Sequence, residues 1–199
     1  MAADAKALAD CLFSMGMLKR TERSGWRTIG VQQPESVADH SFGAAMVGLA
    51  LARMEKADEG KVLKMCLLHD LHELRMGDLN KLNKRYVERD ERKAFRETVE
   101  GMEPTLRGEM ERLFEEFLQC ETLEARIAKD ADALDMMLEA KLLVDTGNRY
   151  AKDWIRSAWE KISTKSGKEL GREIEKRDSL EWLMKMFHAE RARGKRGRK

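Results

Sequence analysis

The sequence has few of the residues that mark turn-rich folds. Two of its 199 residues are proline, and aromatic residues make up 6%. A β-sandwich would need many more turn signals than this, so helix is the default expectation. The chain is long enough to bury a sizeable core within one domain. Its charged fraction of 37% fits helices whose outer faces are solvated.

Cysteine and long apolar runs are also scarce. The three cysteines, Cys11, Cys66 and Cys120, are odd in number and far apart, and no CxxC pair occurs. This argues against a disulfide scaffold and against a cysteine-rich zinc site. No stretch approaches the ~18 consecutive apolar residues of a membrane span, and the sequence does not begin with a basic region followed by an apolar run. We therefore expect a soluble, cytoplasmic protein with no membrane partner.

A strong excess of either charge is absent. Lysine and arginine number 38 against 36 acidic residues, which gives a formal net charge of +2. The exception is the C-terminal segment Arg191–Lys199, RARGKRGRK, which carries basic residues and no acid. Such a segment is typical of a disordered tail, so we expect a domain over residues 1–190 and a tail over residues 191–199. The tail is short and lacks interleaved aromatic residues, which favours a solubilising role over nucleic-acid binding.

Apolar periodicity predicts helices along most of the chain. A loop is expected over residues 19–34, because Pro34 disfavours helix just before it and Ser36 can cap the next helix. Small residues in that next helix, among them Gly43 and Gly48, indicate a close helix crossing. The predicted fold class is all-α, a single-domain helical bundle, with helices at about residues 3–18, 37–54, 59–74, 86–101, 105–120, 123–144, 151–162 and 167–192.

Histidine and aspartate fall on apolar helix faces at three places. His40 follows Val37 at helical spacing, His69 and Asp70 are adjacent within LLHDLHELRMGD, and Asp132 lies beside an apolar stripe in KDADALDMM. Burying an ionised group is costly unless the group is paired or binds a metal. Each of these residues alone fits a hydrogen-bonded core residue. Together, two histidines and two aspartates offer the mixed nitrogen and oxygen ligands that suit Mn, Co, Fe or Zn.

The spacing of nearby residues adds to this cluster. Glu73 lies i+4 from His69 and i+3 from Asp70, so on a continuous helix it shares their face. On the same helix His72 would point about 200° away from Asp70. A carboxylic acid beside a metal site is a candidate for proton transfer.

Two further acids lie near Asp132. Asp135 is i+3 from Asp132 and is placed to orient a ligand through a hydrogen bond. Asp130 is expected to be solvated or to act as a capping residue.

The segments PESVADHSF, LLHDLHELRMGD and AKDADALD, in this order, resemble the HD-domain metal-dependent phosphohydrolases, and in detail the branch that contains the 5'-deoxynucleotidases. The resemblance covers about residues 8–143. It implies that His40, His69, Asp70 and Asp132 bind one divalent cation, with water and a substrate phosphate oxygen completing the shell. The cation would polarise the phosphoryl group and orient or activate the attacking water.

The resemblance also assigns the acids of LLHDLHELRMGD. Glu73 would be the acid/base residue that protonates the leaving 5'-oxygen. Asp78 would lie near the sugar or position water, and its alternative role is to cap a loop. Family members with two irons need extra histidines between Asp70 and Asp132. His72 is the one histidine in that interval, so a single metal ion is expected.

The loop before His40 is expected to contact the nucleotide, since in the family an arginine and a tryptophan do so here. Trp26 fits the tryptophan, although it could instead cover the core. Arg23 and Arg27 are the candidate arginines, with Arg20 nearby. A tryptophan against the sugar would exclude a 2'-hydroxyl by shape and so select deoxyribose.

The predicted function is hydrolysis of deoxyribonucleoside 5'-monophosphates to deoxynucleoside and phosphate. The alternatives are an HD hydrolase of another nucleotide or small phosphate ester, and a non-catalytic nucleotide sensor whose tail binds nucleic acid. The presence of Glu73 beside a complete ligand set favours an enzyme. The resemblance also suggests a homodimer. The apolar faces of helices 86–101 and 105–120 can pack internally or against a partner, so a monomer with these faces in its core is the alternative.

Overall fold

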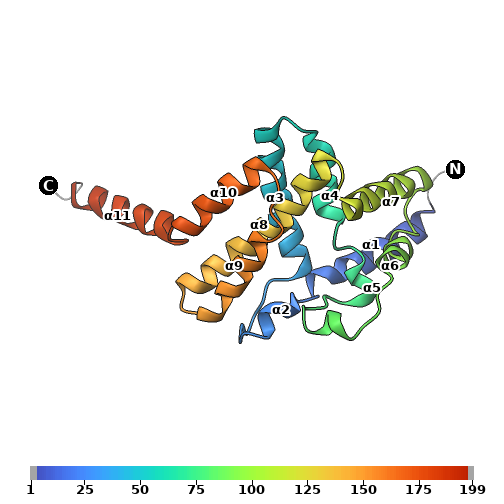
Figure 1. Ribbon diagram of the computed structural model, residues 1–199, viewed down its shortest axis with the longest axis horizontal. Helices are drawn as coiled ribbons and strands as arrows, with labels where there is room; N and C mark the ends of the chain where they lie inside the picture. The colour runs from blue at the N-terminus through green and yellow to red at the C-terminus, as the bar shows by residue number, and fades with distance from the viewer. Residues whose placement is uncertain (1–3, 197–199) are drawn as a thin grey trace.

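Figure 1 shows the computed structural model, which describes the backbone of residues 4–196 and the side chains of residues 4–190. Its described residues form helices and loops, with an isolated bridge between Glu22 and Ser36 and no strand. The predicted all-α class is confirmed. The helices are α1 (Ala5–Met15), η1 (Gly16–Lys19), α2 (Ser24–Arg27), α3 (Val37–Glu55), α4 (Glu59–Leu68), α5 (Glu73–Met76), η2 (Asn83–Arg85), α6 (Glu91–Thr98), α7 (Pro104–Gln119), α8 (Leu123–Asp145), η3 (Arg149–Ala151), α9 (Lys152–Trp159), α10 (Lys165–Lys176) and α11 (Glu181–Arg196).

Helices α3 and α8 pack together at the centre of the molecule (Figure 1), and α8 also packs against α4, α7, α9 and α10. The predicted cap of α3 is confirmed, because Ser36 Oγ accepts the Asp39 N–H and the Asp39 carboxylate accepts the Ser36 N–H. The predicted close crossing is present as well: a Cβ at Gly48 would lie 2.7 Å from Cys66 Sγ of α4. These contacts fix the first turns of α3, where His40 lies.

The helix predicted over residues 59–74 is interrupted, so that prediction was wrong in its second half. Helix α4 ends at Leu68, and a tighter turn follows in which the Glu73 N–H bonds to the Asp70 carbonyl at 3.0 Å. The cause lies in a side chain: His69 Nδ1 is 2.7 Å from the Cys66 carbonyl oxygen, which the Asp70 N–H would use in a continuing helix. His69, Asp70 and Glu73 therefore do not share one helical face.

The helix predicted over residues 167–192 is also divided. Helix α10 ends at Lys176, Arg177 is extended, and α11 begins at Glu181. The break is held by Asp145 at the end of α8, whose carboxylate accepts the Ser179 N–H at 2.8 Å. Helix α11 projects from the bundle (Figure 1) and its backbone is helical through the first six residues of the predicted tail. Residues 197–199 of that tail lie outside the described residues, so the predicted boundary at 190 stays a prediction.

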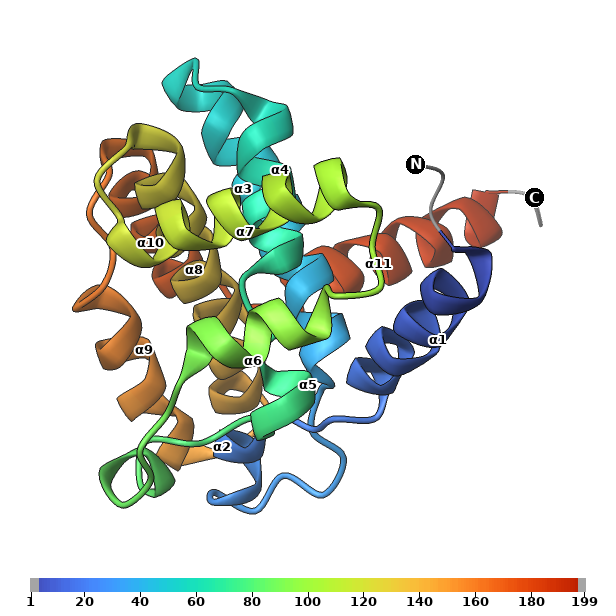
Figure 2. The same cartoon turned by 90° about the vertical axis from the view of Figure 1, so that its right-hand side faces the viewer.

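The core has two connected parts. The larger part surrounds α3, α4 and α8, and the smaller part consists of Phe95, Val99, Met110 and Phe114 between α6 and α7. Leu68 and Leu118 pack against both parts. The apolar faces of α6 and α7 are thus used internally and are not left for a partner. Figure 2 shows α7 crossing α4 and α6 lying beside α5, and both pairs of helices are in contact. None of the helices in the described part of the chain combines the length and hydropathy that crossing a bilayer requires.

Candidate metal centre

The four predicted ligands come from three helices that meet in the centre of the bundle. His40 lies near the start of α3, His69 and Asp70 follow the end of α4, and Asp132 lies in α8. His40 Nε2 is 3.2 Å from Asp132 Oδ1 and 3.8 Å from Asp70 Oδ2, and His69 Nε2 is 3.1 Å from the same Asp70 oxygen. The structure therefore brings together residues that are up to 92 positions apart in the sequence.

Both imidazoles are oriented so that Nε2 faces this cluster. His40 Nδ1 lies 2.7 Å from Asp135 Oδ2, and His69 Nδ1 lies 2.7 Å from the Cys66 carbonyl oxygen. The two rings are edge to face with centroids 5.3 Å apart. Among the described residues, both Nε2 atoms are buried and neither meets the geometry of a hydrogen bond, although each lies 3.1 to 3.2 Å from a carboxylate oxygen. Buried polar nitrogens without a partner are rare in native proteins and call for an explanation.

A divalent cation fits this arrangement. Ligand atoms that share one ion at bond lengths of about 2.1 Å lie about 3.0 to 3.4 Å from one another. The distances from His40 Nε2 to Asp132 (3.2 Å) and from His69 Nε2 to Asp70 (3.1 Å) fall in this range. The distance from His40 Nε2 to Asp70, 3.8 Å, is 0.4 Å longer than its upper limit. Neutral imidazoles held through Nδ1 and carboxylates are the donor set expected for Mn, Co, Fe or Zn. His40, His69 and Asp70 therefore fit the implied metal, because one ligand atom of each lies within 4.8 Å of the other two. Asp132 is connected to this group through its contact with His40 Nε2 at 3.2 Å.

The electrostatics of the cluster also require a positive charge at its centre. Burial and the charge of Arg23 lower the pKa of His40, but Asp132 and Asp135 outweigh them and raise that pKa to about 10. Burial raises the pKa of Asp132, yet His40, Lys161 and His69 together hold it well below its ordinary value. The carboxylates thus hold either a proton on His40 or a cation in its place, and metal binding would release that proton.

Arg23 lies directly beside the ligand set. Its Nη1 atom donates to Asp70 Oδ2 at 3.0 Å, and its Nε atom lies 3.9 Å from Asp78 Oδ2. The bridge between Glu22 and Ser36 ties its loop to the start of α3. Burial lowers the pKa of Arg23, but Asp70, Asp78 and other acids nearby raise it above its ordinary value, so the guanidinium stays charged. Of the two candidate arginines, Arg23 is the one next to the cluster.

Arg27 and Trp26 are placed differently. Arg27 forms a two-pronged ion pair with Glu22 on the surface and donates to the Gln32 carbonyl oxygen, and these contacts do not involve the cluster. Trp26 is 2% exposed, stacks at 5.5 Å against Trp154, and donates its indole N–H to Glu35. The alternative in which Trp26 covers the core therefore has the better structural support.

Glu73 is a buried acid at the edge of the cluster. It is 6% exposed, and its Oε2 atom makes no hydrogen bond to the described residues. Burial, together with the charges of Asp70 and Asp78, raises the pKa of Glu73 to about 9. At neutral pH without a metal this carboxyl carries a proton that it can donate.

His72 lies closer to these acids than a continuous helix would allow. One ligand atom from each of Asp70, His72 and Glu73 lies within 4.8 Å of the other two. The expectation that His72 points away from Asp70 was therefore wrong, because the turn after His69 is tighter than an α-helix. His72 Nδ1 is 3.0 Å from the His69 carbonyl oxygen, which accounts for one of its two ring nitrogens.

Asp78 anchors the loop that carries Arg23. Its carboxylate accepts the Ser24 N–H at 2.9 Å, and the Ser24 hydroxyl donates to the Asp78 carbonyl oxygen at 2.7 Å. These bonds match the loop-capping role that the sequence left open. Through them, Asp78 holds the guanidinium of Arg23 beside Asp70.

Lys161 was missed in the sequence: it falls within the helix predicted over residues 151–162, whereas α9 ends at Trp159 and Lys161 lies in the turn that follows. Its Nζ atom lies 3.9 Å from Asp132 Oδ2, whereas Arg23 contacts Asp70. Lys129 is also nearby: its ammonium sits 3.7 Å from the centre of the Phe117 ring, and burial lowers its pKa. Arg23 and Lys161 are thus two cations that each contact a carboxylate of the ligand set.

Asp130 turns away from the cluster and holds the start of α10. It is fully buried and accepts hydrogen bonds from the N–H and hydroxyl groups of both Ser163 and Thr164. The cap of α10 is Thr164, so Asp130 holds the capping residue and does not itself cap the helix; the expectation that Asp130 is solvated was wrong.

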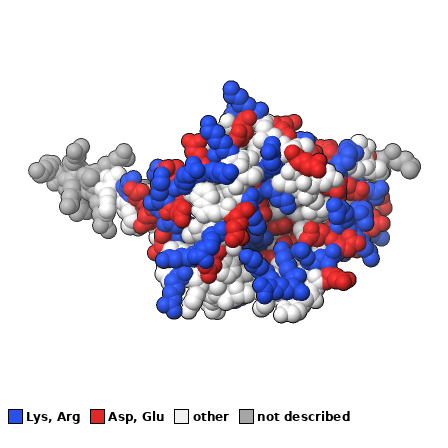
Figure 3. All heavy atoms as spheres, viewed as in Figure 1, with Lys and Arg blue, Asp and Glu red and all other residues white. Residues whose placement is uncertain are grey.

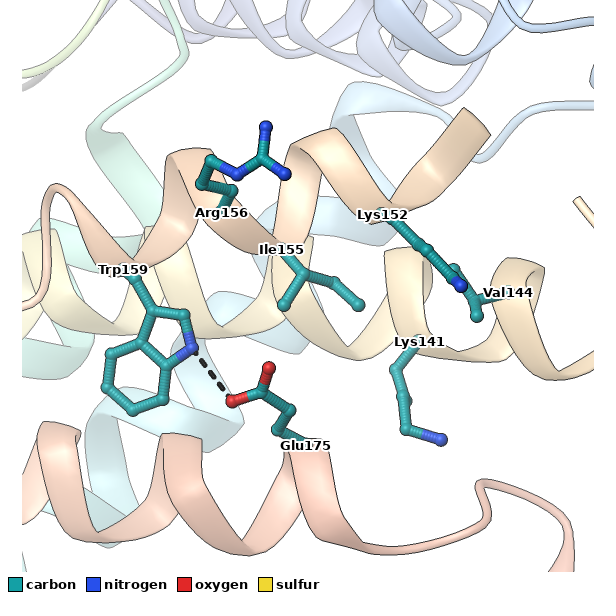
Figure 4. Close-up of a pocket in the computed structure, with 7 residues that line it drawn as sticks. All are labelled: Lys141, Val144, Lys152, Ile155, Arg156, Trp159 and Glu175. Carbon is teal, nitrogen blue, oxygen red and sulfur yellow. Dashed lines mark hydrogen bonds between the residues drawn. The ribbon is translucent and has the colours of Figure 1, made fainter. Parts of the chain in front are cut away.

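A separate pocket of about 410 Å³ lies between α8, α9 and α10 (Figure 4), lined by Lys141, Val144, Lys152, Ile155, Arg156, Trp159 and Glu175. Its polar groups are largely paired with one another or with neighbours. Trp159 donates to Glu175 at 3.1 Å, and Lys141 pairs with Asp145. The buried polar atoms that make no hydrogen bond in the histidine and aspartate cluster have no counterpart among the described residues that line this pocket. The cluster is therefore the candidate site.

The fold and the cluster together define an all-α protein with a mixed nitrogen and oxygen metal centre. A family model described as HD domain matches residues 15–177. The chain belongs to the HD domain family. It is 36% identical to 5'-deoxynucleotidase HDDC2 of Dictyostelium discoideum over 135 residues, which cover 63% of this chain and 71% of that protein. It is 30% identical to human 5'-deoxynucleotidase HDDC2 over 139 residues, 68% of each chain.

Solved structures share the same fold. A conserved hypothetical protein from Pyrococcus furiosus is 29% identical and superposes with a TM-score of 0.71 over 85% of this chain and 99% of that chain. A predicted metal-dependent phosphohydrolase from Magnetospirillum magnetotacticum MS-1 is 24% identical, with a TM-score of 0.65 over 87% of this chain and 94% of that chain. At that identity the second comparison supports the fold alone.

Proposed function

We propose that this protein is a metal-dependent phosphohydrolase that removes the 5'-phosphate from deoxyribonucleoside 5'-monophosphates. The observation that carries the chemistry is the convergence of two buried imidazole nitrogens, neither of them hydrogen-bonded, with the carboxylates of Asp70 and Asp132. The substrate class rests on the names of the curated relatives, which are 5'-deoxynucleotidases.

The proposed metal ligands are His40, His69, Asp70 and Asp132, which would hold one divalent ion of Mn, Co, Fe or Zn. When bound, such an ion polarises the phosphoryl group and makes an attacking water more acidic. The chain's own contribution is to hold both Nε2 atoms toward the ion through hydrogen bonds at Nδ1.

We assign the substrate phosphate to the side of the cluster that Arg23 and Lys161 flank. A guanidinium binds phosphate oxygens through two parallel hydrogen bonds, and an ammonium adds a point charge. Asp78 supports this contact indirectly, because it fixes the backbone of Ser24 next to Arg23. We give Arg27 and Trp26 no direct contact, since the first pairs with Glu22 and the second is buried.

We assign proton donation to Glu73. Cleavage of the bond between phosphorus and the 5'-oxygen leaves an alkoxide, which is a poor leaving group unless it receives a proton. A buried carboxyl with a raised pKa is protonated at neutral pH and can supply that proton.

We also propose a homodimer that acts in the cytoplasm. The faces of α6 and α7 are used in the core, so a partner would have to cover other apolar side chains. Large apolar side chains are exposed on α1, η1, α3 and α11, namely Leu12, Phe13, Met17, Phe42, Met46, Met54, Trp182, Met184, Met186 and Phe187. The cysteines are unpaired, as in reducing compartments. Light scattering coupled to size-exclusion chromatography gives the oligomeric state, and a mass of 22.9 kDa would contradict the dimer.

Nucleic acid is not a proposed partner. Figure 3 shows Lys and Arg interspersed with Asp and Glu across one face of the molecule, without a broad field of positive charge on that face. A nucleic-acid surface would need basic residues clustered on a face or along a helix. We therefore expect a small nucleotide as the substrate.

The test is phosphate release from a panel of 5'- and 3'-nucleotides, both ribo and deoxy. Metal-stripped protein is assayed with added Co, Mn, Zn or Mg, alongside Asp70→Ala. Release from deoxy 5'-monophosphates that requires metal and is lost in the variant supports the proposal. If only triphosphates or another ester are hydrolysed, the proposed substrate is wrong and the proposed mechanism stays. Tight metal binding without any phosphate release favours the nucleotide sensor.

A further inference from the structure

His40 is the ligand whose orientation depends on another side chain. Its Nδ1 atom lies 2.7 Å from Asp135 Oδ2, and the imidazole is fully buried. His69, by contrast, is held by the backbone carbonyl of Cys66, which no substitution removes. A substitution of Asp135 can therefore disturb the orientation of His40 without replacing a proposed metal ligand.

The helix that carries His40 leaves room for Asp135. A Cβ built on Gly43 would lie 1.9 Å from Asp135 Oδ1 and 2.7 Å from its Cγ, and the three atoms nearest to that position all belong to Asp135. Real Cβ atoms do not approach other heavy atoms below about 3.0 Å. Asp135 is short and rooted on α8, so it cannot keep its bond to His40 if position 43 carries a methyl group.

We infer that Asp135 is a positioning residue that fixes the angle and tautomer of His40 for metal binding, and that Gly43 is required because Asp135 occupies the space of its side chain. The inference rests on the proposed metal centre. An Nδ1–H donated to a carboxylate leaves the Nε2 lone pair for the metal and increases its basicity. The same bond restricts rotation of the imidazole ring, so the ring loses less rotational freedom when the metal binds.

The experiment measures the metal dissociation constant of purified, metal-stripped full-length protein by competition with a chromogenic chelator for Co²⁺. Loss of a partner that orients a ligand typically weakens metal affinity by about 10-fold to 100-fold. We expect a loss in this range for Asp135→Ala and for Gly43→Ala. Asp135→Asn keeps an oxygen that can accept the Nδ1–H, so its loss should be smaller than that of Asp135→Ala.

The double variant Gly43→Ala/Asp135→Ala provides the sharper test. If the methyl group at position 43 acts by displacing Asp135, it has nothing left to displace, and the double variant should bind Co²⁺ like Asp135→Ala alone. Gly108→Ala is the matched control, because a Cβ there meets its nearest atom, Arg112 Nη1, at 3.5 Å. We expect this control to bind Co²⁺ like the wild type.

Circular dichroism and thermal unfolding confirm that each variant is folded before its affinity is compared, and Asp135→Asn and Gly43→Ala serve if Asp135→Ala does not fold. Visible absorption of the Co²⁺ complex adds a spectroscopic readout, and its bands should shift in Asp135→Ala if the His40 ring turns. Wild-type affinity and spectrum in folded Asp135→Ala, or losses that add in the double variant, would overturn the inference alone. A wild type that binds no metal would overturn the proposed function with it.

Discussion

Replacement of Glu73 with glutamine tests the proposed proton donor. Glutamine has nearly the same volume as glutamic acid, so the 6% exposed site should accept it without a cavity. The substitution removes the acidic proton, which burial and the charges of Asp70 and Asp78 hold on Glu73 by raising its pKa to about 9. General acid catalysis typically contributes about 10²-fold to 10⁴-fold to a rate. We expect kcat for a deoxynucleoside 5'-monophosphate to fall by about 10²-fold to 10³-fold, or about 2.7 to 4 kcal/mol in the barrier.

A comparison of two substrates with different leaving groups tests whether the loss in kcat comes from the missing proton donor. A phenolic phosphate ester with a strongly acidic leaving group needs no proton, so Glu73→Gln should hydrolyse it at nearly the wild-type rate. Steady-state phosphate release on both substrates measures the two rates, and Glu97→Gln is the control because Glu97 is exposed. Equal losses on the two substrates, or no loss on the nucleotide, would refute the assignment of Glu73 as the acid.

The pH dependence has a defined sign. The carboxyl must be protonated to donate, so kcat of the wild type should fall as pH rises through the Glu73 pKa. In the metal-loaded protein the cation lowers this pKa, and we expect the fall to begin below pH 9. The descending limb should be missing from the residual activity of Glu73→Gln.

Three further variants or conditions have defined outcomes. Arg23→Ala should raise KM for the nucleotide by about 10-fold to 100-fold in steady-state assays, because a charge-assisted hydrogen bond contributes about 1.5 to 3 kcal/mol; an unchanged KM would place the phosphate elsewhere. Asp130→Ala should lower the free energy of unfolding by about 3 kcal/mol in urea titrations, since four hydrogen bonds from Ser163 and Thr164 lose their buried acceptor; a loss below about 1 kcal/mol would contradict this. Saturation with metal at 100 times its Kd should add about 2.7 kcal/mol of stability. That corresponds to a Tm increase of about 5 to 11 °C by calorimetry for a chain of this size, and an unchanged Tm would mean that folded protein binds no metal.

The fold class could be predicted from the sequence because it depends on local patterns. The four proposed ligands were identified by the resemblance to a family, and the structure brings them close together. The helix carrying His40 shows its cap at Ser36, and its small residues indicate the crossing at Gly48. The four proposed ligands lie in apolar segments, where a charged group needs compensation. These features are visible without knowing which helices meet.

The break after Leu68 could not be predicted, because apolar periodicity continues through it. It depends on the His69 ring reaching the Cys66 carbonyl, a competition between side chain and backbone that the residue pattern does not record. The division between α10 and α11 likewise depends on Asp145, which lies 34 positions before Ser179. One break thus coincides with a local hydrogen bond and the other with a hydrogen bond between segments far apart in the sequence.

The surroundings of the ligands were predicted less well for a related reason. Trp26, Arg23 and Arg27 lie within five residues, yet one is buried, one faces the cluster and one is on the surface. The short helix α2 separates their directions, and nothing in the segment predicts a helix of four residues. Lys161 reaches Asp132 only because α9 and α10 fold back against α8.

The most direct test of the metal centre is calorimetric titration of metal-stripped protein with Mn²⁺ or Co²⁺, repeated for Asp70→Asn. We predict one ion per chain in the wild type and loss of that binding in the variant, because Asp70 Oδ2 lies within 3.8 Å of both ligand nitrogens. Absence of binding in the wild type, two ions per chain, or unchanged binding in Asp70→Asn would contradict the account.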